Sequence, residues 1–167
     1  MYFLETERLG FGRWDDGLRE QARTLWGDPM VTRLIGAPEG FTPEQIDARL
    51  RLEEENQRAH NVQYWPVFLR ETGDLVGCCG LRPAGEKGVM ELGYHLRPRY
   101  WHMGLATEAG RAVVRYAFEA LGVSALEAGH HPDNDASARV LARLGFRRIG
   151  TQYYPPTGLQ HPTYRLP

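Results

Sequence analysis

The chain has 167 residues, the length of one typical domain, so we expect a single domain over residues 1–167. Hydrophobic residues make up 42% and charged residues 25%, which excludes an intrinsically disordered chain and predicts a packed core. Lys and Arg total 20 and Asp and Glu total 21, a net charge of −1 that argues against nucleic acids and anionic membranes as partners.

Two further features indicate the compartment. No apolar run approaches the roughly 18 residues of a membrane-spanning helix, and the acidic Glu5 precedes any apolar core of a signal peptide. Cys78 and Cys79 are adjacent, so in a strand they point to opposite faces and suit neither an ordinary disulfide nor a zinc site. We therefore expect a cytoplasmic protein with reduced cysteines and no membrane partner.

Hydrophobic period and turn residues predict the elements of the first half. A helical stripe follows Asp15-Asp16 and ends at Gly27. A second helix, over 42–59, begins with a capping box formed by Thr42 and Gln45. Residues 63–81 are typical of an antiparallel hairpin, and residues 89–96 of a third strand in a meander.

The second half alternates helix and strand. A period of 3.6 residues over 107–121 predicts the strongest helix, and residues 134–144 predict another, closed by Gly145 in a left-handed cap. Short strands are expected over 124–128, 146–153 and 163–166. The elements together indicate an α+β or mixed α/β domain, with a sheet covered by helices on both sides.

Three apparent motifs do not withstand inspection. The segment from Gly80 to Gly88 has the glycine spacing of a P-loop, but Glu86 interrupts the Gly-Lys pair, so a hairpin turn explains it better. Neither of the two serines lies in the nucleophile elbow of a serine hydrolase. The adjacent His130 and His131 diverge, and no histidines have the spacing of a metalloprotease helix, so we expect no metal site.

The segment from Pro98 to Ala109 carries the strongest functional signal. It comprises the exit of a strand, a turn that contains Gly104 and the first turn of the strongest helix. Such a junction presents unpaired backbone N–H groups at the positive end of the helix dipole, which favours an anion. Gly104 removes the side chain where a phosphate would approach the backbone, although a plain turn is the alternative interpretation.

This segment, from Trp101 to Ala109, resembles the Trp-x-x-Gly-x-Ala-Thr-Glu-Ala signature of the GCN5-related N-acetyltransferases (GNAT), in the branch that includes the ribosomal-protein N-terminal alanine acetyltransferases. Residues 131–146 are similar to the family's Asn-x-x-Ser helix that ends in Gly-Phe. The opening Glu7-Arg8-Leu9 and the ending from His161 to Leu166 are also similar. The resemblance implies a GNAT-like domain, whose mixed, mostly antiparallel twisted sheet of about six to seven strands is flanked by about four helices.

The resemblance also implies acetyl-CoA as the acetyl donor. Its pantetheine would follow the strand edge near Leu96, and Asn134 would reach the pantetheine or the acyl end. Family members usually have Gly at position 102 and a basic residue or Gln at 103, where this chain has His102 and Met103. If the backbone geometry is kept, these two side chains should point away from the phosphate. The pyrophosphate would lie on the backbone amides of His102, Met103, Gly104, Leu105, Ala106 and Thr107.

Acyl transfer to an amine requires a base, donors for the developing oxyanion and a proton for the sulfur. Glu91 is the preferred base, directly or through water, because it lies on the strand that leads to the cofactor turn. His95, four residues on and on the same strand face, is the alternative. The N–H groups from Tyr94 to Leu96 would bind the carbonyl oxygen if the strand bulges or splays there.

The source of the proton for sulfur is a departure from the family pattern. Many relatives have a tyrosine acid at the position of Leu141. Ser137 resembles a serine proposed to assist the thiolate in this branch, so Ser137 or a water molecule would donate the proton here. A small residue for close helix packing is the alternative interpretation of Ser137.

The implied function is acetyl-CoA-dependent N-acetylation of a primary amine, either a protein N-terminus or a small amine, by a monomer or a homodimer. A non-catalytic acyl-CoA-binding sensor is the alternative, and the release of free CoA with a panel of amines would distinguish the two. The expected acceptor loops, 36–42 and 153–161, carry no recognisable chemistry. A neutral-to-acidic groove with Trp65, Tyr153 and Tyr154 nearby would indicate an amine with an apolar body.

Overall fold

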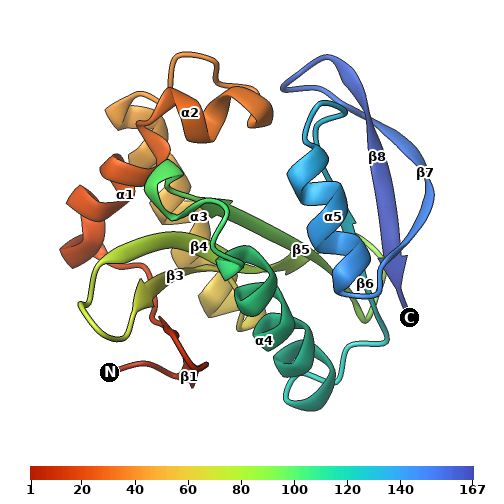
Figure 1. Cartoon of the computed structure of the whole chain (residues 1–167), viewed down its shortest axis with the longest axis horizontal. Helices are drawn as coiled ribbons and strands as arrows, with labels where there is room; N and C mark the ends of the chain where they lie inside the picture. The colour runs from red at the N-terminus through yellow and green to blue at the C-terminus, as the bar shows by residue number, and fades with distance from the viewer.

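Eight strands form one mixed sheet in the order β1-β2-β3-β4-β5-β6-β8-β7 in the computed structural model, which describes all 167 residues (Figure 1). Neighbouring strands are antiparallel except β5 and β6, which run parallel. The strands are β1 (Leu4–Glu5), β2 (Leu9–Phe11), β3 (Tyr64–Leu69), β4 (Leu75–Pro83), β5 (Val89–Leu96), β6 (Ala125–Gly129), β7 (Arg147–Tyr154) and β8 (Leu159–Leu166).

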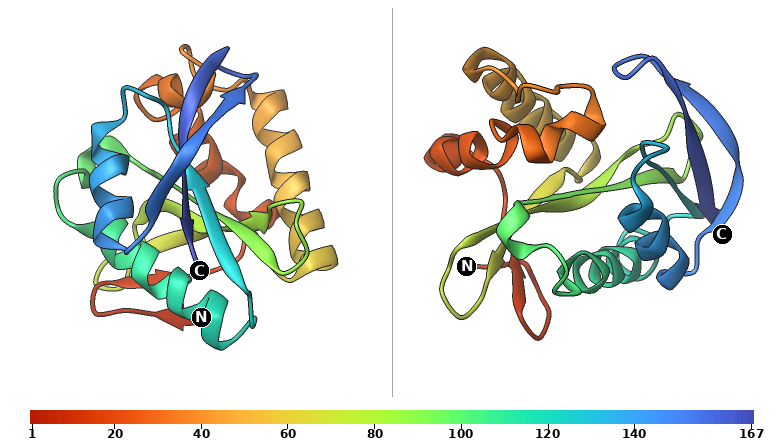
Figure 2. Two further views of the ribbon diagram at one scale, coloured as in Figure 1. Left: turned by 90° about the vertical axis from the view of Figure 1, so that its right-hand side faces the viewer. Right: turned by 45° about the horizontal axis from the view of Figure 1, so that its top comes forward.

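Helices cover both faces of this sheet. The first three lie on one face, and α4 and α5 lie on the other (Figure 2, right). None of them combines the length and the apolar composition needed to cross a membrane. The α-helices are α1 (Arg19–Trp26), α2 (Pro29–Thr32), α3 (Pro43–His60), α4 (Leu105–Glu119) and α5 (Asp135–Arg143), and the 3-10 helices are η1 (Asp16–Leu18), η2 (Arg33–Ile35) and η3 (Pro98–Tyr100).

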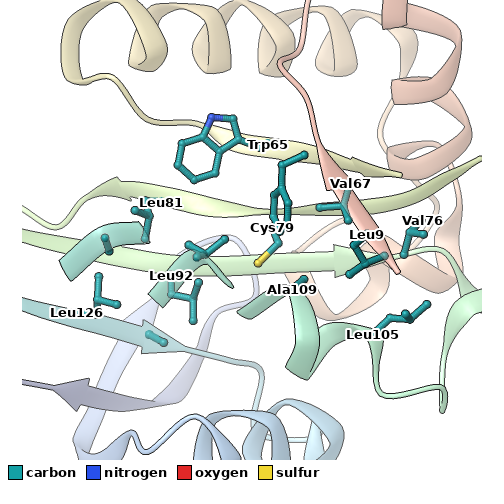
Figure 3. Close-up of a cluster of buried hydrophobic side chains, with 14 of the residues drawn as sticks. Leu9, Trp65, Val67, Val76, Cys79, Leu81, Leu92, Leu105, Ala109 and Leu126 are labelled. Atoms are coloured by element: carbon teal, nitrogen blue, oxygen red, sulfur yellow. The ribbon is translucent and has the colours of Figure 1, made fainter. Parts of the chain in front are cut away.

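Each face of the sheet has its own hydrophobic core, because neighbouring residues of a strand point to opposite faces. On one face, Cys79 and Leu92 pack with Ala109 of α4 (Figure 3). On the other face, Cys78 belongs to a second core with Trp26 of α1. Both cysteines are free and buried, and they lie on opposite faces as the sequence predicts.

Local sequence determines where the helices begin and end. The predicted capping box is present, because Thr42 Oγ1 accepts from the Gln45 N–H at 3.2 Å and Gln45 Oε1 accepts from the Thr42 N–H at 2.8 Å. Asn134 caps α5, and Gly145 beyond its end has a φ of 91°. The predicted capping box and the left-handed Gly145 are confirmed.

The fold class is confirmed, but the elements are more numerous than predicted. The sheet has eight strands rather than about six to seven, because the first residues add β1 and β2, which are too short to show an alternating pattern. The helix predicted from residue 107 begins at Leu105, and β8 begins at Leu159 rather than at residue 163. The pattern does not predict α2, a four-residue helix with Pro29 at its first position.

The parallel strands β5 and β6 separate at their carboxyl ends. Their register joins Val89, Met90 and Glu91 to residues 125–127 and goes no further. Beyond that point β5 stays paired with β4 through Leu96, whereas β6 stays paired with β8 through Gly129. The sheet is therefore split between β5 and β6, next to the segment that leads into α4.

Candidate active site

A cleft of about 1370 Å³ opens at this split. Its walls come from β5, the loop before α4, the start of α5, the α2–η2 segment and the β7–β8 hairpin. Of the residues predicted from the sequence, the following line it: Glu91, Leu96, His102, Gly104, Leu105, Ala106, Thr107, Asn134 and Ser137. Met103 is not among the lining residues, and its side chain is exposed to solvent.

The N-terminus of α4 has no side-chain cap. Gly104 is the N-cap, in a left-handed conformation with a φ of 76°, and the first helical hydrogen bond is donated by the Glu108 N–H to the Gly104 carbonyl at 3.1 Å. The N–H groups of Leu105, Ala106 and Thr107 consequently have no helical acceptor. They lie at the positive end of a 15-residue helix, so this turn suits an anion.

Two contacts position the loop before α4. The Trp101 indole N–H donates to the Leu96 carbonyl at 2.9 Å, which ties the loop to the end of β5. Arg8 donates to the Met103 carbonyl at 3.0 Å and forms an ion pair with Glu108 at 2.6 Å. The Trp and the Glu of the sequence motif therefore hold the loop in place.

His102 adopts a left-handed backbone conformation, with a φ of 63°. A β-carbon is strained there by roughly 1 kcal/mol, so glycine suits this position better than histidine does. His102 lines the cleft one residue before the exposed Met103.

The free edge of β5 faces the split. The Arg97 N–H donates to the Val76 carbonyl of β4 at 2.9 Å. Because N–H directions alternate along an antiparallel strand, the N–H groups of Tyr94 and Leu96 point away from β4. On that side the pairing with β6 has already ended at Glu91. The β4–β5 ladder is regular here, so the strand splays rather than bulges.

Glu91 lies at the last residue that pairs β5 with β6. Its carboxylate accepts a hydrogen bond at 3.1 Å from the hydroxyl of the buried Tyr64. Tyr64 reaches it across the sheet because Gly80 and Gly93 lie beside it in register on β4 and β5. A Cβ on Gly93 would stand 2.3 Å from the Tyr64 hydroxyl oxygen, so only glycine leaves room for the ring.

The hydroxyl of Tyr64 keeps its proton. Burial and the nearby Glu91 carboxylate raise the pKa of Tyr64 well above its usual value. The phenol therefore donates to Glu91 and orients its carboxylate. The sequence does not predict Tyr64, because the contact depends on two glycines in two different strands.

His95 lies on the same face of β5 as Glu91, as predicted. The Trp26 indole can only donate, and it points at His95 Nδ1 at 3.2 Å, so the proton of the imidazole is on Nε2. Burial and the guanidinium groups of Arg49 and Arg82 lower the pKa of His95 well below its usual value. A neutral ring with its only acceptor nitrogen engaged is suited to donate a hydrogen bond, not to act as a base.

Ser137 and Tyr94 form a hydrogen-bonded pair in the cleft. Their hydroxyl oxygens are 2.7 Å apart, with Tyr94 on β5 and Ser137 in the first turn of α5. Ser137 N–H also donates to the Asn134 side-chain oxygen at 3.0 Å, so the amide group of Asn134 keeps its two donors for another partner. Burial raises the pKa of Tyr94, so its hydroxyl stays protonated.

Of the expected acceptor loops, 153–161 contributes to the other end of the cleft, whereas no residue of 36–42 lines it and the preceding α2–η2 segment does so instead. Tyr153 and Tyr154 line it. A Cβ on Gly36 would stand 2.6 Å from the Cβ of Pro156, so the segment after α2 contacts the β7–β8 turn. The two loops therefore meet across this end of the cleft.

The groove at this end differs from the conditional expectation. Trp65 is 1% exposed, belongs to the core and donates to Gln57, so it is not part of the groove. The lining includes the cationic Arg49 and Arg82 as well as the anionic Glu91.

Comparisons with known proteins identify related sequences and structures. The family model described as "Acetyltransferase (GNAT) domain" matches residues 8–147. The uncharacterized N-acetyltransferase YoaA of Bacillus subtilis is 31% identical over 163 residues, which cover 96% of this chain and 92% of that protein. The ribosomal protein uS5-alanine N-acetyltransferase of Escherichia coli is 27% identical over 110 residues, 65% of this chain and 57% of that protein. The crystal structure of a GNAT-family acetyltransferase from Bacillus anthracis has a TM-score of 0.84 at 23% identity, covering 98% of this chain and 96% of that one.

Proposed function

The chain belongs to the GNAT acetyltransferases and is an acyltransferase, and we propose that it transfers the acetyl group of acetyl-CoA to the nitrogen of a primary amine. One observation carries the proposal: the uncapped N-terminus of α4 lies beside the unpaired edge of β5. The first suits the pyrophosphate and the second suits the amide groups of the pantetheine. Asn134, with its donors free, would bind the pantetheine or the acyl end.

Glu91 is the proposed base. The amine nitrogen forms a bond to the thioester carbonyl carbon, the proton leaves the nitrogen for Glu91 directly or through water, and the carbon–sulfur bond breaks. Tyr64 holds the carboxylate in place through its hydroxyl. His95 is less suited, because Trp26 engages its acceptor nitrogen. The N–H groups of Tyr94 and Leu96 are the proposed donors to the carbonyl oxygen.

Ser137 is the proposed proton donor to the departing thiolate. Leu141, which occupies the position of the family's tyrosine acid, is fully buried in the core and carries no proton to donate. Ser137 is hydrogen-bonded to Tyr94, which can replace a proton that Ser137 gives up. A proton would thus reach sulfur through two hydroxyl groups of the cleft.

We also place this activity in the cytoplasm and in one domain over residues 1–167. Both cysteines are free, which suits a reducing compartment. A single sheet includes strands from both ends of the chain, which supports one domain. The proposed site is built from residues of one chain, and the proposal covers both a monomer and a homodimer.

A binding experiment tests the proposed cofactor site. We predict that acetyl-CoA stabilises the protein, by about 2.7 kcal/mol at a concentration of one hundred times Kd, and that Gly104→Val removes this effect. The valine side chain would occupy the space of the phosphate. The measurement is the shift in Tm on titration with acetyl-CoA.

Gly73→Val is the matched control. Gly73 also has a positive φ, 79°, but lies in open space in the turn between β3 and β4, so the same backbone strain arises far from the cleft. This variant should respond to acetyl-CoA as the parent protein does. A Gly104→Val protein that responds equally well would show that the turn is not the site. Release of free CoA with a panel of amines then separates an enzyme from a sensor that only binds.

A further inference from the structure

Arg49 of α3 lines the acceptor end of the cleft and has no partner within the protein. Its Nε is buried without a hydrogen bond, and no carboxylate lies within ion-pair distance of its guanidinium. The guanidinium instead stacks over the rings of Trp26, at 4.9 Å, and Phe41, at 5.6 Å. These two rings hold it in place without neutralising its charge.

The nearby acidic group is already engaged. Glu53, one helical turn from Arg49, is completely buried, and one of its oxygens pairs with Arg82 at 2.6 Å. Its other oxygen accepts the N–H of Tyr64. Both oxygens of Glu53 are therefore engaged, and neither pairs with Arg49. Burial, and then the repulsion from the positive charge of Arg82, lower the pKa of Arg49.

Tyr64 relates this cation to the proposed base. Its hydroxyl donates to Glu91, and it also interacts electrostatically with Arg49 and Arg82. Arg49 and Glu91 both line the cleft, so an acceptor whose amine lies at Glu91 would share the cleft with the guanidinium of Arg49. An anion carried by the acceptor would offset the cost of the buried, unpaired cation.

We propose that Arg49 binds a carboxylate of the acceptor, and that the acceptor is a small molecule with an amine and a carboxylate, that is, an amino acid. This inference rests on the proposed N-acetyltransferase function. A planar guanidinium forms two parallel hydrogen bonds with a carboxylate, which also fixes the direction of the amine toward Glu91. A protein N-terminus carries a neutral amide where a free amino acid carries its carboxylate.

Matched acceptors test the inference. The probes are phenylalanine, leucine and methionine, each compared with its carboxamide and with the amine left after removal of the carboxylate. We expect kcat/KM to be about 10- to 100-fold higher for the amino acids than for their carboxamides, the factor that a hydrogen bond to a charged group supplies. Preference for the carboxamides, for the simple amines or for a peptide N-terminus would overturn the inference.

Variants of Arg49 assign the preference to this residue. Arg49→Met should remove it by lowering kcat/KM for the amino acids only, and Arg49→Lys should restore part of it. Arg51→Met is the control, because Arg51 lies on the same helix, is exposed and does not line the cleft. An Arg49→Met enzyme that binds acetyl-CoA normally and keeps the preference would overturn the role of Arg49.

The two proposals fail in different ways. If the parent protein neither binds acetyl-CoA nor releases CoA with any amine, the proposed function fails. If it acetylates amines without regard to the carboxylate, the proposed function stands and only this inference fails. Melting curves of each variant, recorded without ligand, separate loss of the contact from loss of the fold.

Discussion

At the scale of single residues, Glu91 is the residue whose substitution should lower the rate of catalysis most. We predict that Glu91→Gln lowers kcat at neutral pH by about 10²- to 10⁴-fold, the contribution of a general base, while the KM for acetyl-CoA stays the same. The rate should recover at high pH, where the free amine predominates. The pH dependence of kcat between pH 6 and 10 checks this.

Tyr64→Phe should produce a smaller loss with the same pH dependence, because the carboxylate remains but loses the hydrogen bond that orients it. The control is Glu119→Gln at the exposed end of α4, away from the cleft. A Glu91→Gln enzyme with unchanged kcat, or one that gains nothing at high pH, would remove Glu91 from the role of base.

Ser137 carries the second residue-scale prediction. The CoA thiol has a pKa near 8.5, so its thiolate is a fairly good leaving group and depends little on an acid. We therefore predict that Ser137→Ala lowers kcat by no more than about tenfold to a hundredfold. Steady-state kinetics and melting curves check this, and Tyr94→Phe should have a similar effect on kcat, since it breaks the same pair. If Ser137→Ala lowers Tm but leaves kcat intact, Ser137 is a packing residue and water supplies the proton.

Some of the site could be predicted from individual residues and some could not. The roles of Gly104 and Asn134 at helix starts follow from local sequence, because capping involves residues within one turn. Tyr64, Tyr94 and Arg49 could not be found this way. Their contacts join residues that are far apart in the chain, and nothing in the local pattern distinguishes them from ordinary residues of a strand or a helix face.

At the scale of elements, the prediction was most accurate where one element carries its own signals. Helix α3 begins at its capping box, and β4 and β5 form a hairpin around the turn that precedes Val89. Strand β2 could not be predicted, because a three-residue strand depends on its neighbour β3 for its hydrogen bonds. The split between β5 and β6 could not be predicted either, because it depends on where pairing stops and not on either strand alone.

The opening segment Glu7-Arg8-Leu9 and the motif at the start of α4, which both resemble the family, lie in contact with each other. Glu108, in the first turn of α4, accepts hydrogen bonds from Thr6 at 2.7 Å and from the Arg8 backbone at 2.9 Å. Partial burial opposes ionisation of Glu108, but these hydrogen bonds and the Arg8 guanidinium outweigh it and lower its pKa. The opening segment and the helix motif therefore form one structural unit.

At the scale of the whole molecule, His95 joins the helical layer to the sheet. It accepts from Trp26 of α1 and lies beside Cys78 of β4. Its pKa in the folded protein is lowered, chiefly by burial, whereas the unfolded chain titrates near pH 6.5. Below about pH 6.5 the unfolded state therefore binds a proton that the folded state does not, and stability falls as the pH falls.

We predict that the free energy of unfolding decreases below about pH 6.5 by up to about 1.4 kcal/mol per pH unit from His95, and that His95→Asn reduces this slope. Asparagine keeps an acceptor near the position of Nδ1 but does not titrate. Urea unfolding at a series of pH values from 8 to 5 measures it. His161, whose pKa burial also lowers, leaves a residual slope. The exposed His60→Gln is the control, and an unaltered slope in His95→Asn would contradict the prediction.

The contact between Glu108 and the opening segment also bears on how the protein is made. Its partners Thr6 and Arg8 lie 102 and 100 residues earlier in the chain. Strand β8 follows β7 in the chain but lies between β6 and β7 in the sheet, and it completes a wall of the cleft. A ribosome that stops before this strand thus releases a chain without a finished cleft. Without β8, strand β6 lacks its antiparallel neighbour and the acceptor end of the cleft lacks a wall, although every residue proposed to bind acetyl-CoA precedes β8 in the chain.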